Sequence, residues 1–161
     1  MVSEDGNTYA ANALQKAVAI ATWSGRAALA DDSGLEVDAL GGAPGVRSAR
    51  YAGVEQDSRA NVAKLLQALA SAPPAQRTSH FRCVIAVARP DGLTVTAAGS
   101  CDGIITEQPR GDAGFGYDPV FFYPPSGLTF AEMSPAQKNQ VSHRAQACRK
   151  LRESLIEFLR G

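Results

Sequence analysis

The chain has 161 residues, 45% hydrophobic and 20% charged, which is enough for one domain with a buried core. Its 16 basic and 16 acidic residues balance, which excludes a global field that would attract nucleic acid or an anionic membrane. We expect a cytoplasmic protein with free thiols. The three cysteines are widely spaced, and the sequence shows no signal segment and no apolar run of about 20 residues.

The first half of the chain predicts two helices separated by a strand and a loop. A helix is expected over residues 9–23, with Gly25 placed to end it. A short apolar strand over 27–30 follows and is expected to stop at two aspartates. Residues 34–53 are rich in glycine and predict a structured loop. The second helix is expected to begin at Asp57 or Ser58 and to run to about residue 69.

The second half predicts a hairpin, two further strands and two helices. Alternating apolar residues over 81–88, a Pro-Asp-Gly turn at 90–92 and a return over 93–98 predict the hairpin. Further strands are expected over 103–106 and 119–122. A capping box begins one helix at Ser134, and Ser142 is expected to cap a longer one. The mixture predicts an α/β or α+β fold with a twisted mixed sheet, as one domain over residues 1–161.

Two adjacent carboxylates, Asp31 and Asp32, follow the first predicted strand. Buried carboxylates are costly unless they are solvated, hydrogen-bonded or bound to a cation, and Mg²⁺ commonly takes one or two of them. The alternative is an Asx turn, which favours the Asp, Ser and Gly residues found over 31–34. Glu4, before the first predicted helix, and Lys16, within it, are on their own ordinary surface charges.

Two other segments have the composition of ligand-binding loops. The glycine-rich stretch over 111–119 carries Phe115 and Tyr117, and an aromatic ring can stack on a base where glycines allow close approach. The alternative is a tight connection whose aromatics belong to the core. Ser142-His143-Arg144 at a helix start offers donors suited to an anion or a purine oxygen, with Lys138 one turn upstream. Here the alternative is a capped surface helix.

Taken in order, these segments resemble one family across nearly the whole chain. The matching segments are Asn12-Ala13-Leu14-Gln15-Lys16, Ala30 to Gly53, Gly114-Phe115-Gly116-Tyr117-Asp118-Pro119, Thr129-Phe130-Ala131-Glu132-Met133, and Lys138 with Ser142-His143-Arg144. The sequence is similar to the inosine/xanthosine triphosphate pyrophosphatases. That resemblance implies a long curved mixed sheet, two lobes around a cleft, and a homodimer.

The resemblance also implies an activity and its residues. Members hydrolyse ITP, dITP and XTP to the monophosphate and pyrophosphate with Mg²⁺. The catalytic residues would be Asp32, Asp31 and Lys16; the metal ligands Glu4 and Asp32; and the substrate-binding residues Ser33, Phe115, Gly116, Tyr117, Asp118, Lys138, His143 and Arg144. Donors such as His143 and Arg144 would meet the 6-oxo group of the purine, and the 6-amino group of adenine would leave them unpaired.

One departure from the family pattern shapes a second hypothesis. Members begin with a strand, a Ser/Thr-x-Asn-x-x-Lys phosphate loop and a helix, and this chain is expected to lack that N-terminal unit. The primary hypothesis is an active pyrophosphatase. The alternative is a truncated homologue with weak or no hydrolysis, acting as a nucleotide-binding or dimerising module whose exposed sheet edge alters strand pairing.

Overall fold

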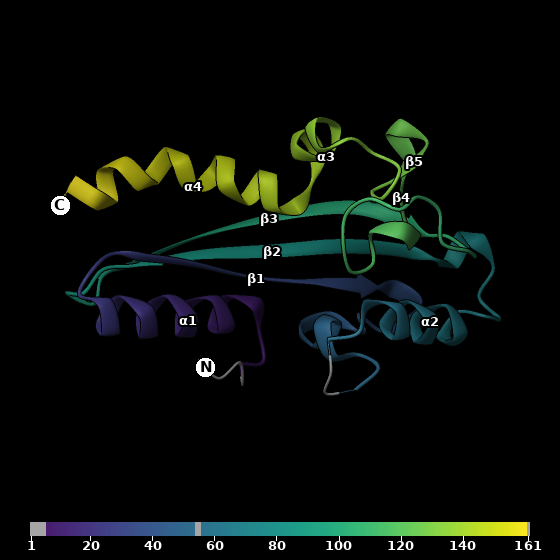
Figure 1. Cartoon of the computed structure of the whole chain (residues 1–161), viewed down its shortest axis with the longest axis horizontal. Coiled ribbons are helices and arrows are strands. Elements are labelled where there is room, and N and C mark those ends of the chain that lie inside the picture. Colours follow the sequence, from purple (N-terminus) through teal and green to yellow (C-terminus); the bar gives the residue numbers. More distant parts are fainter. Residues whose placement is uncertain (1–5, 54–55, 161) are drawn as a thin grey trace. The chain divides into compact units, whose positions relative to one another are not determined.

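The protein is described by a computed structural model that covers residues 6–53 and 56–160. Within these residues, five strands form one sheet in the order β1-β2-β3-β4-β5, accompanied by four α-helices and short 3₁₀ turns (Figure 1). The strands are β1 (Ala28–Val37), β2 (Thr78–Ala88), β3 (Thr94–Ile105), β4 (Phe121–Tyr123) and β5 (Leu128–Thr129). The helices are α1 (Tyr9–Ser24), α2 (Ser58–Ala68), α3 (Pro135–Val141) and α4 (His143–Arg160).

The sheet is antiparallel throughout the strands that the structure describes. β2 and β3 are joined by a tight turn, which can connect only antiparallel neighbours, and β4 pairs antiparallel with both β3 and β5. The segment between β1 and β2, which contains α2, begins and ends at the same end of the two strands. Strand β2 therefore runs antiparallel to β1 (Figure 1). The prediction of a mixed sheet is therefore wrong for these strands. The α-and-β class is confirmed.

The residues divide into two compact units, which we describe separately. Unit 1 comprises residues 1–33, 82–100 and 142–161, and unit 2 comprises 34–81 and 101–141. The cleft expected between two lobes stays a prediction. In the described part of the chain, no helix combines the length and apolar character that crossing a membrane requires.

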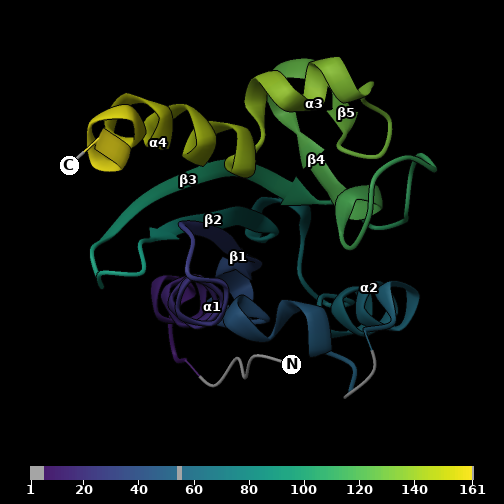
Figure 2. The same ribbon diagram turned by 60° about the vertical axis from the view of Figure 1, so that its left-hand side comes forward.

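Unit 1 is built from alternating side chains on β2, both faces of which are buried. Ala86 and Ala88 pack with the alanines of α1, whereas Cys83, Ile85 and Val87 pack with Ala147 and Leu151 of α4. Figures 1 and 2 show α1 and α4 on opposite faces of the strands. Helix α1 follows the prediction closely: it begins after the Thr8 cap and ends at Gly25, whose φ of 65° suits glycine.

Unit 2 has an aromatic core on one face of its strand segments and helix α2 on the other. Phe121 lies 4.4 Å from Phe81 and 4.7 Å from Phe130 between ring centroids. Helix α2 begins at the predicted Asp57 cap, which accepts two backbone N–H groups, and buries Val62 and Leu65. Figure 2 shows α2 and the β4–β5–α3 segment on opposite sides of the strands.

Two predicted strand boundaries are wrong, and the cause is the same. The first strand does not stop at the aspartates, because β1 continues to Val37. The strands expected over 93–98 and 103–106 are one strand, β3, which passes through Gly99. In both cases polar or small residues that resemble a strand break are accommodated by a helix that packs against them.

Candidate functional site

Asp31 and Asp32 lie within β1, and they face opposite sides of the sheet. Successive side chains of a strand alternate, so neighbours cannot share a face. Ala28 and Ala30 pack with α1, and Asp32 continues that face because it contacts α1. Asp31 contacts α4 instead. The two carboxylates therefore stand in two different environments of unit 1, although they are adjacent in sequence.

The Asp32 carboxylate is held by two side chains of α1. Asn12 Nδ2 donates to Asp32 Oδ2 at 3.0 Å, and Lys16 Nζ lies 3.6 Å from Oδ1. Asn12 and Lys16 are one helical turn apart and so share a face. Asn12 is itself buried, and its Oδ1 accepts the Gly6 N–H at 2.8 Å. The carboxylate is thus oriented from a fixed helix while its side chain stays 13% exposed.

The Asp31 carboxylate is occupied by donors on the α4 side. Arg144 Nε and Nη2 donate to its Oδ2 at 3.0 and 2.8 Å, and Ser33 Oγ donates to the same oxygen at 3.2 Å. Cys83 Sγ lies 3.8 Å from it, and burial raises the pKa of that thiol to about 11, so it keeps its proton. Burial lowers the pKa of Arg144, but the hydrogen bonds and charge of Asp31 outweigh this and raise it overall.

The start of α4 is fixed by a close backbone approach. The predicted Ser142 cap is confirmed, because its Oγ accepts the Ala145 N–H at 3.2 Å. His143 is buried. At Gly99 of β3, an added Cβ would lie 2.1 Å from the His143 carbonyl oxygen, so only glycine lets the first turn of α4 lie this close to the strand. The backbone of Arg144 is therefore held in place.

The Asp32 site offers one oriented carboxylate, a ligand type that Mg²⁺ accepts. Within residues 6–53 and 56–160, no three Asp, Glu, His or Cys side chains gather where they could hold an ion. Mg²⁺ is bound through one or two carboxylates, with water and substrate phosphates completing its shell, so one oriented carboxylate fits it. Glu4, the other predicted metal ligand, lies outside the described residues.

In unit 2, the predicted base-pocket residues centre on the buried carboxylate of Asp118, which is 2% exposed. Lys138 Nζ forms an ion pair with Asp118 Oδ2, and the Phe115 N–H donates to the same oxygen at 2.8 Å. The ammonium also lies 4.7 Å from the centre of the Phe115 ring. The structure therefore brings Phe115, Asp118 and Lys138 into one cluster.

The two aromatics of the glycine-rich loop have different environments. Phe115 is 64% exposed, as a stacking platform requires. Tyr117 is buried in the unit 2 core and donates from its hydroxyl to the Ser48 carbonyl at 2.8 Å. A pocket of about 710 Å³ is lined by Phe115, Gly116 and apolar residues of α2 such as Val62 and Leu66. Tyr117, Asp118 and Lys138 do not line it.

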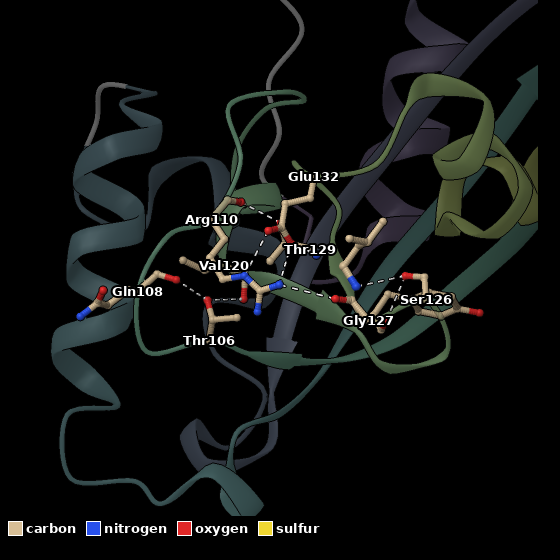
Figure 3. Close-up of polar contacts among 10 residues, drawn as sticks. Thr106, Gln108, Arg110, Val120, Ser126, Gly127, Thr129 and Glu132 are labelled. Carbon is tan, nitrogen blue, oxygen red and sulfur yellow. Dashed lines mark hydrogen bonds and ion pairs between the residues drawn. The ribbon is translucent and has the colours of Figure 1, made fainter.

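Both ends of the glycine-rich loop are anchored by polar contacts (Figure 3). At its start, Arg110 pairs with Glu132 at 2.9 Å, and Thr129 Oγ1 donates to the Arg110 carbonyl at 2.7 Å. The Thr129 N–H donates to Glu132 Oε2 at 2.8 Å, and this bond, followed by Arg110, lowers the pKa of Glu132. Near its end, Thr106 Oγ1 lies 3.4 Å from the Val120 carbonyl. The loop is therefore an ordered part of unit 2.

Sequence reasoning missed two residues that shape the carboxylate sites. Asn12 orients Asp32. It could have been recognised as a polar residue four positions before Lys16 on a helix face that is otherwise buried and rich in alanine. Cys83 contacts Asp31, and no local pattern distinguished it from a core residue. The assigned roles of the individual site residues stay predictions.

The chain matches the model of the Ham1 family over residues 1–154. A dITP/XTP pyrophosphatase from Desulforamulus reducens is 56% identical over 154 residues, which cover 96% of this chain and 77% of that protein. A dITP/XTP pyrophosphatase from Geobacillus kaustophilus is 52% identical over 160 residues, covering 99% of this chain and 78% of its own length.

Solved structures show the same fold. The Ham1 protein of Staphylococcus aureus superimposes with a TM-score of 0.90 at 42% identity, covering 98% of this chain and 81% of that one. A HAM1 protein from Coxiella burnetii gives the same TM-score and identity, with 97% and 80% coverage. The family match begins at residue 1, so it does not support the predicted absence of the family's N-terminal strand, phosphate loop and helix.

Proposed function

This chain belongs to the Ham1 family, and we propose that it hydrolyses non-canonical purine nucleoside triphosphates such as dITP, ITP and XTP to the monophosphate and pyrophosphate. One observation of the structure carries the proposal. The Asp32 carboxylate, partly exposed, is oriented by Asn12 and lies 3.6 Å from the Lys16 ammonium. An anion of β1 and a cation of α1 held this close together provide both a proton acceptor and a phosphate contact.

In the proposed reaction, water attacks the α-phosphorus. The new bond joins the water oxygen to that phosphorus, and the bond to the bridging oxygen of the β-phosphate breaks, so pyrophosphate leaves. The Asp32 carboxylate accepts the proton of the attacking water. Lys16 donates to phosphate oxygens and offsets their charge, and the Asn12 hydrogen bond keeps the carboxylate from turning away.

The proposed cofactor is Mg²⁺, held by Asp32 with Glu4 as the second ligand. When bound, it supplies charge neutralisation on the triphosphate. Ser33 is proposed as a further substrate-binding residue, on the α4 side of β1 with Asp31. The described contacts of Ser33 include a hydrogen bond to Asp31 Oδ2, which orients its hydroxyl group from within the same strand.

The proposed base-recognition residues are those that the family resemblance implies. Phe115 stacks on the purine with Gly116 beside it, while Tyr117 and Asp118 hold the loop and Lys138 from within the core. His143 and Arg144 donate to the 6-oxo group. We also propose a homodimer, because β1 stands at the end of the strand order and an edge strand favours pairing; sedimentation as a monomer would contradict it.

The proposed function is tested by measuring pyrophosphate release from dITP, XTP, dGTP and dATP with Mg²⁺. We expect selective release from dITP and XTP, and a loss of about 10³-fold in kcat for Asp32→Asn, because the proton acceptor is removed. Asp91→Asn is the matched control, since Asp91 belongs to an ion pair of the β2–β3 turn.

Other outcomes separate the alternatives. Unchanged turnover in Asp32→Asn removes this residue from the mechanism, and release of single phosphates contradicts the reaction. If no product forms while dITP still raises the melting temperature, the chain is a nucleotide-binding module that does not hydrolyse its ligand, which was the second hypothesis.

A further inference from the structure

We propose that Asp31 is a positioning residue for Arg144, and that through Arg144 it sets the preference for 6-oxo over 6-amino purines. The inference rests on the proposed function, because it takes the substrate class from there. It changes the expected role of Asp31, which the family resemblance placed beside Asp32 in the hydrolytic site.

The side chains of β1 alternate between its two faces. Asp32 faces α1, where Asn12 and Lys16 contact it, and Asp31 faces α4, where Arg144 contacts it. Side chains on opposite faces of a strand point away from each other, so one cation or one water cannot be shared by both in the way that a carboxylate pair shares it. Asp31 therefore belongs structurally to the Ser142-His143-Arg144 segment.

Several donors converge on one oxygen of Asp31. Asp31 Oδ2 accepts from Arg144 Nε and Nη2 at 3.0 and 2.8 Å and from Ser33 Oγ at 3.2 Å, and Cys83 Sγ lies at 3.8 Å. Asp31 Oδ2 is therefore occupied by hydrogen bonds, and this oxygen would have to surrender contacts with Arg144 or Ser33 to ligate a metal or to receive a proton.

The Arg144 guanidinium is held at both its backbone and its side chain. Its backbone is held by the close approach of Gly99 to the His143 carbonyl and by the Ser142 cap. A guanidinium is planar with five N–H groups in a fixed arrangement, so binding Nε and Nη2 to one oxygen also sets the direction of the other donors. Asp31 thus determines where Arg144 presents its N–H groups.

A positioned donor discriminates between purines by their chemistry. Hypoxanthine and xanthine carry an acceptor oxygen at position 6, and adenine carries an amino donor there. An arginine fixed in place donates to the 6-oxo oxygen of the first and leaves its donors unpaired against the 6-amino group of the second. An arginine that is free to reorient can avoid the adenine amino group, so the preference weakens without any loss of the proton acceptor.

The test measures kcat and KM for dITP and dATP in Asp31→Asn, with Asp91→Asn as the matched control. Asp91 also pairs with an arginine of unit 1, at 2.7 Å, but in the β2–β3 turn. We expect the ratio of kcat/KM for dITP over dATP to fall about tenfold or more in Asp31→Asn, mainly through a higher KM for dITP. The control is expected to keep the wild-type ratio.

A double-mutant cycle separates positioning from a general structural effect. If Asp31 acts through Arg144, then Asp31→Asn changes the ratio by less than about twofold when Arg144→Ala is already present, because contacting residues are not additive. Asp31→Glu keeps the carboxylate and is expected to give a ratio between those of the wild type and Asp31→Asn. Partial unfolding would lower both activities together and leave the ratio unchanged.

Three results overturn the inference. One is an unchanged dITP/dATP ratio in Asp31→Asn, one is additivity with Arg144→Ala, and one is a loss of kcat as large as in Asp32→Asn. If the wild type hydrolyses neither nucleotide, the proposed function fails, and the same variants are compared by their Kd for dITP and dATP. In that case, equal affinities of the wild type for the two nucleotides would overturn this inference as well.

Discussion

The two units each place a cation of the predicted substrate site on a carboxylate, but in different environments. In unit 1, the Arg144 and Asp31 side chains are 41% and 33% exposed. In unit 2, the Lys138 and Asp118 side chains are 18% and 2% exposed. In the Arg144–Asp31 pair, two nitrogens of the guanidinium donate to the carboxylate. In the Lys138–Asp118 pair, the ammonium contacts an oxygen that also accepts a backbone N–H.

This difference suggests different purposes for the two pairs. A buried pair is costly to break, because the remaining charge stays in a medium of low polarity. An exposed pair contributes little to stability but fixes the direction of its donors. We therefore interpret Asp118–Lys138 as part of the framework of the glycine-rich loop, and Asp31–Arg144 as part of recognition. Three predictions test this comparison.

The largest effect is expected from removing each cation in turn. Lys138→Met should lower the free energy of unfolding by about 3 kcal/mol, because it leaves Asp118 charged and buried. Arg144→Met should lower it by less than about 1 kcal/mol, since its partner can be solvated. Urea unfolding of the two variants measures the difference. Equal losses would contradict the distinction between the two ion pairs. Adding Asp118→Asn to Lys138→Met should restore part of the stability, because the buried charge is removed.

A smaller effect is expected within the loop that carries Phe115. At Gly114, φ is 77° and an added Cβ would lie 2.1 Å from Asp118 Oδ2, whereas at Gly116 φ is 60° and nothing lies within 4 Å. Gly116→Ala should cost about 1 kcal/mol from backbone strain alone. Gly114→Ala should cost about 1 kcal/mol more, because it also displaces the buried carboxylate. Thermal unfolding compares them, and equal costs would argue against a tightly packed Asp118 cluster.

The smallest effect is expected at His80, an exposed acid–base contact of unit 2. His80 Nδ1 lies 2.8 Å from Asp102 Oδ1 and Nε2 lies 3.2 Å from Asp38 Oδ1; the Asp102 hydrogen bond is the main cause that raises the pKa of His80. A raised folded-state pKa stabilises the fold below the unfolded value of 6.5, and the effect is lost as pH rises through the folded value.

His80→Gln should therefore destabilise the protein by less than about 1 kcal/mol at pH 5.5 and by nothing measurable from this source at pH 9. The measurement is urea unfolding at both values of pH. A loss as large as that of Lys138→Met would show that membership of unit 2, and not burial, sets the energy of its ion pairs.

Much of the fold follows from local sequence signals. Helix α1 ends at Gly25, helix α2 begins after the Asp57 cap, and Ser142 caps α4, as predicted. The hairpin turn over residues 90–92 is also confirmed by the ends of β2 and β3. These features depend on residues within a few positions of one another, so a single sequence contains the information.

The carboxylate sites depend on partners that are distant in the sequence. Asp31 is satisfied by Arg144, 113 positions away, and Asp32 by Asn12, 20 positions away. Without those partners, Asp-Asp-Ser-Gly resembles a strand end, which is why the continuation of β1 was not predicted. The strand predicted over 93–98 ends one residue before Gly99 for the same reason, because the contact of Gly99 with α4 is tertiary. Tyr117 was assigned to the base pocket, although its side chain is buried in the unit 2 core.

We propose that the adjacent residues Asp31 and Asp32 have different roles. The decisive measurement is kcat for pyrophosphate release from dITP in wild type, Asp31→Asn and Asp32→Asn under one set of conditions. We expect kcat to fall about 10³-fold in Asp32→Asn and far less in Asp31→Asn, which should be impaired mainly in KM. Equal losses of kcat in the two variants would contradict the separate roles of Asp31 and Asp32.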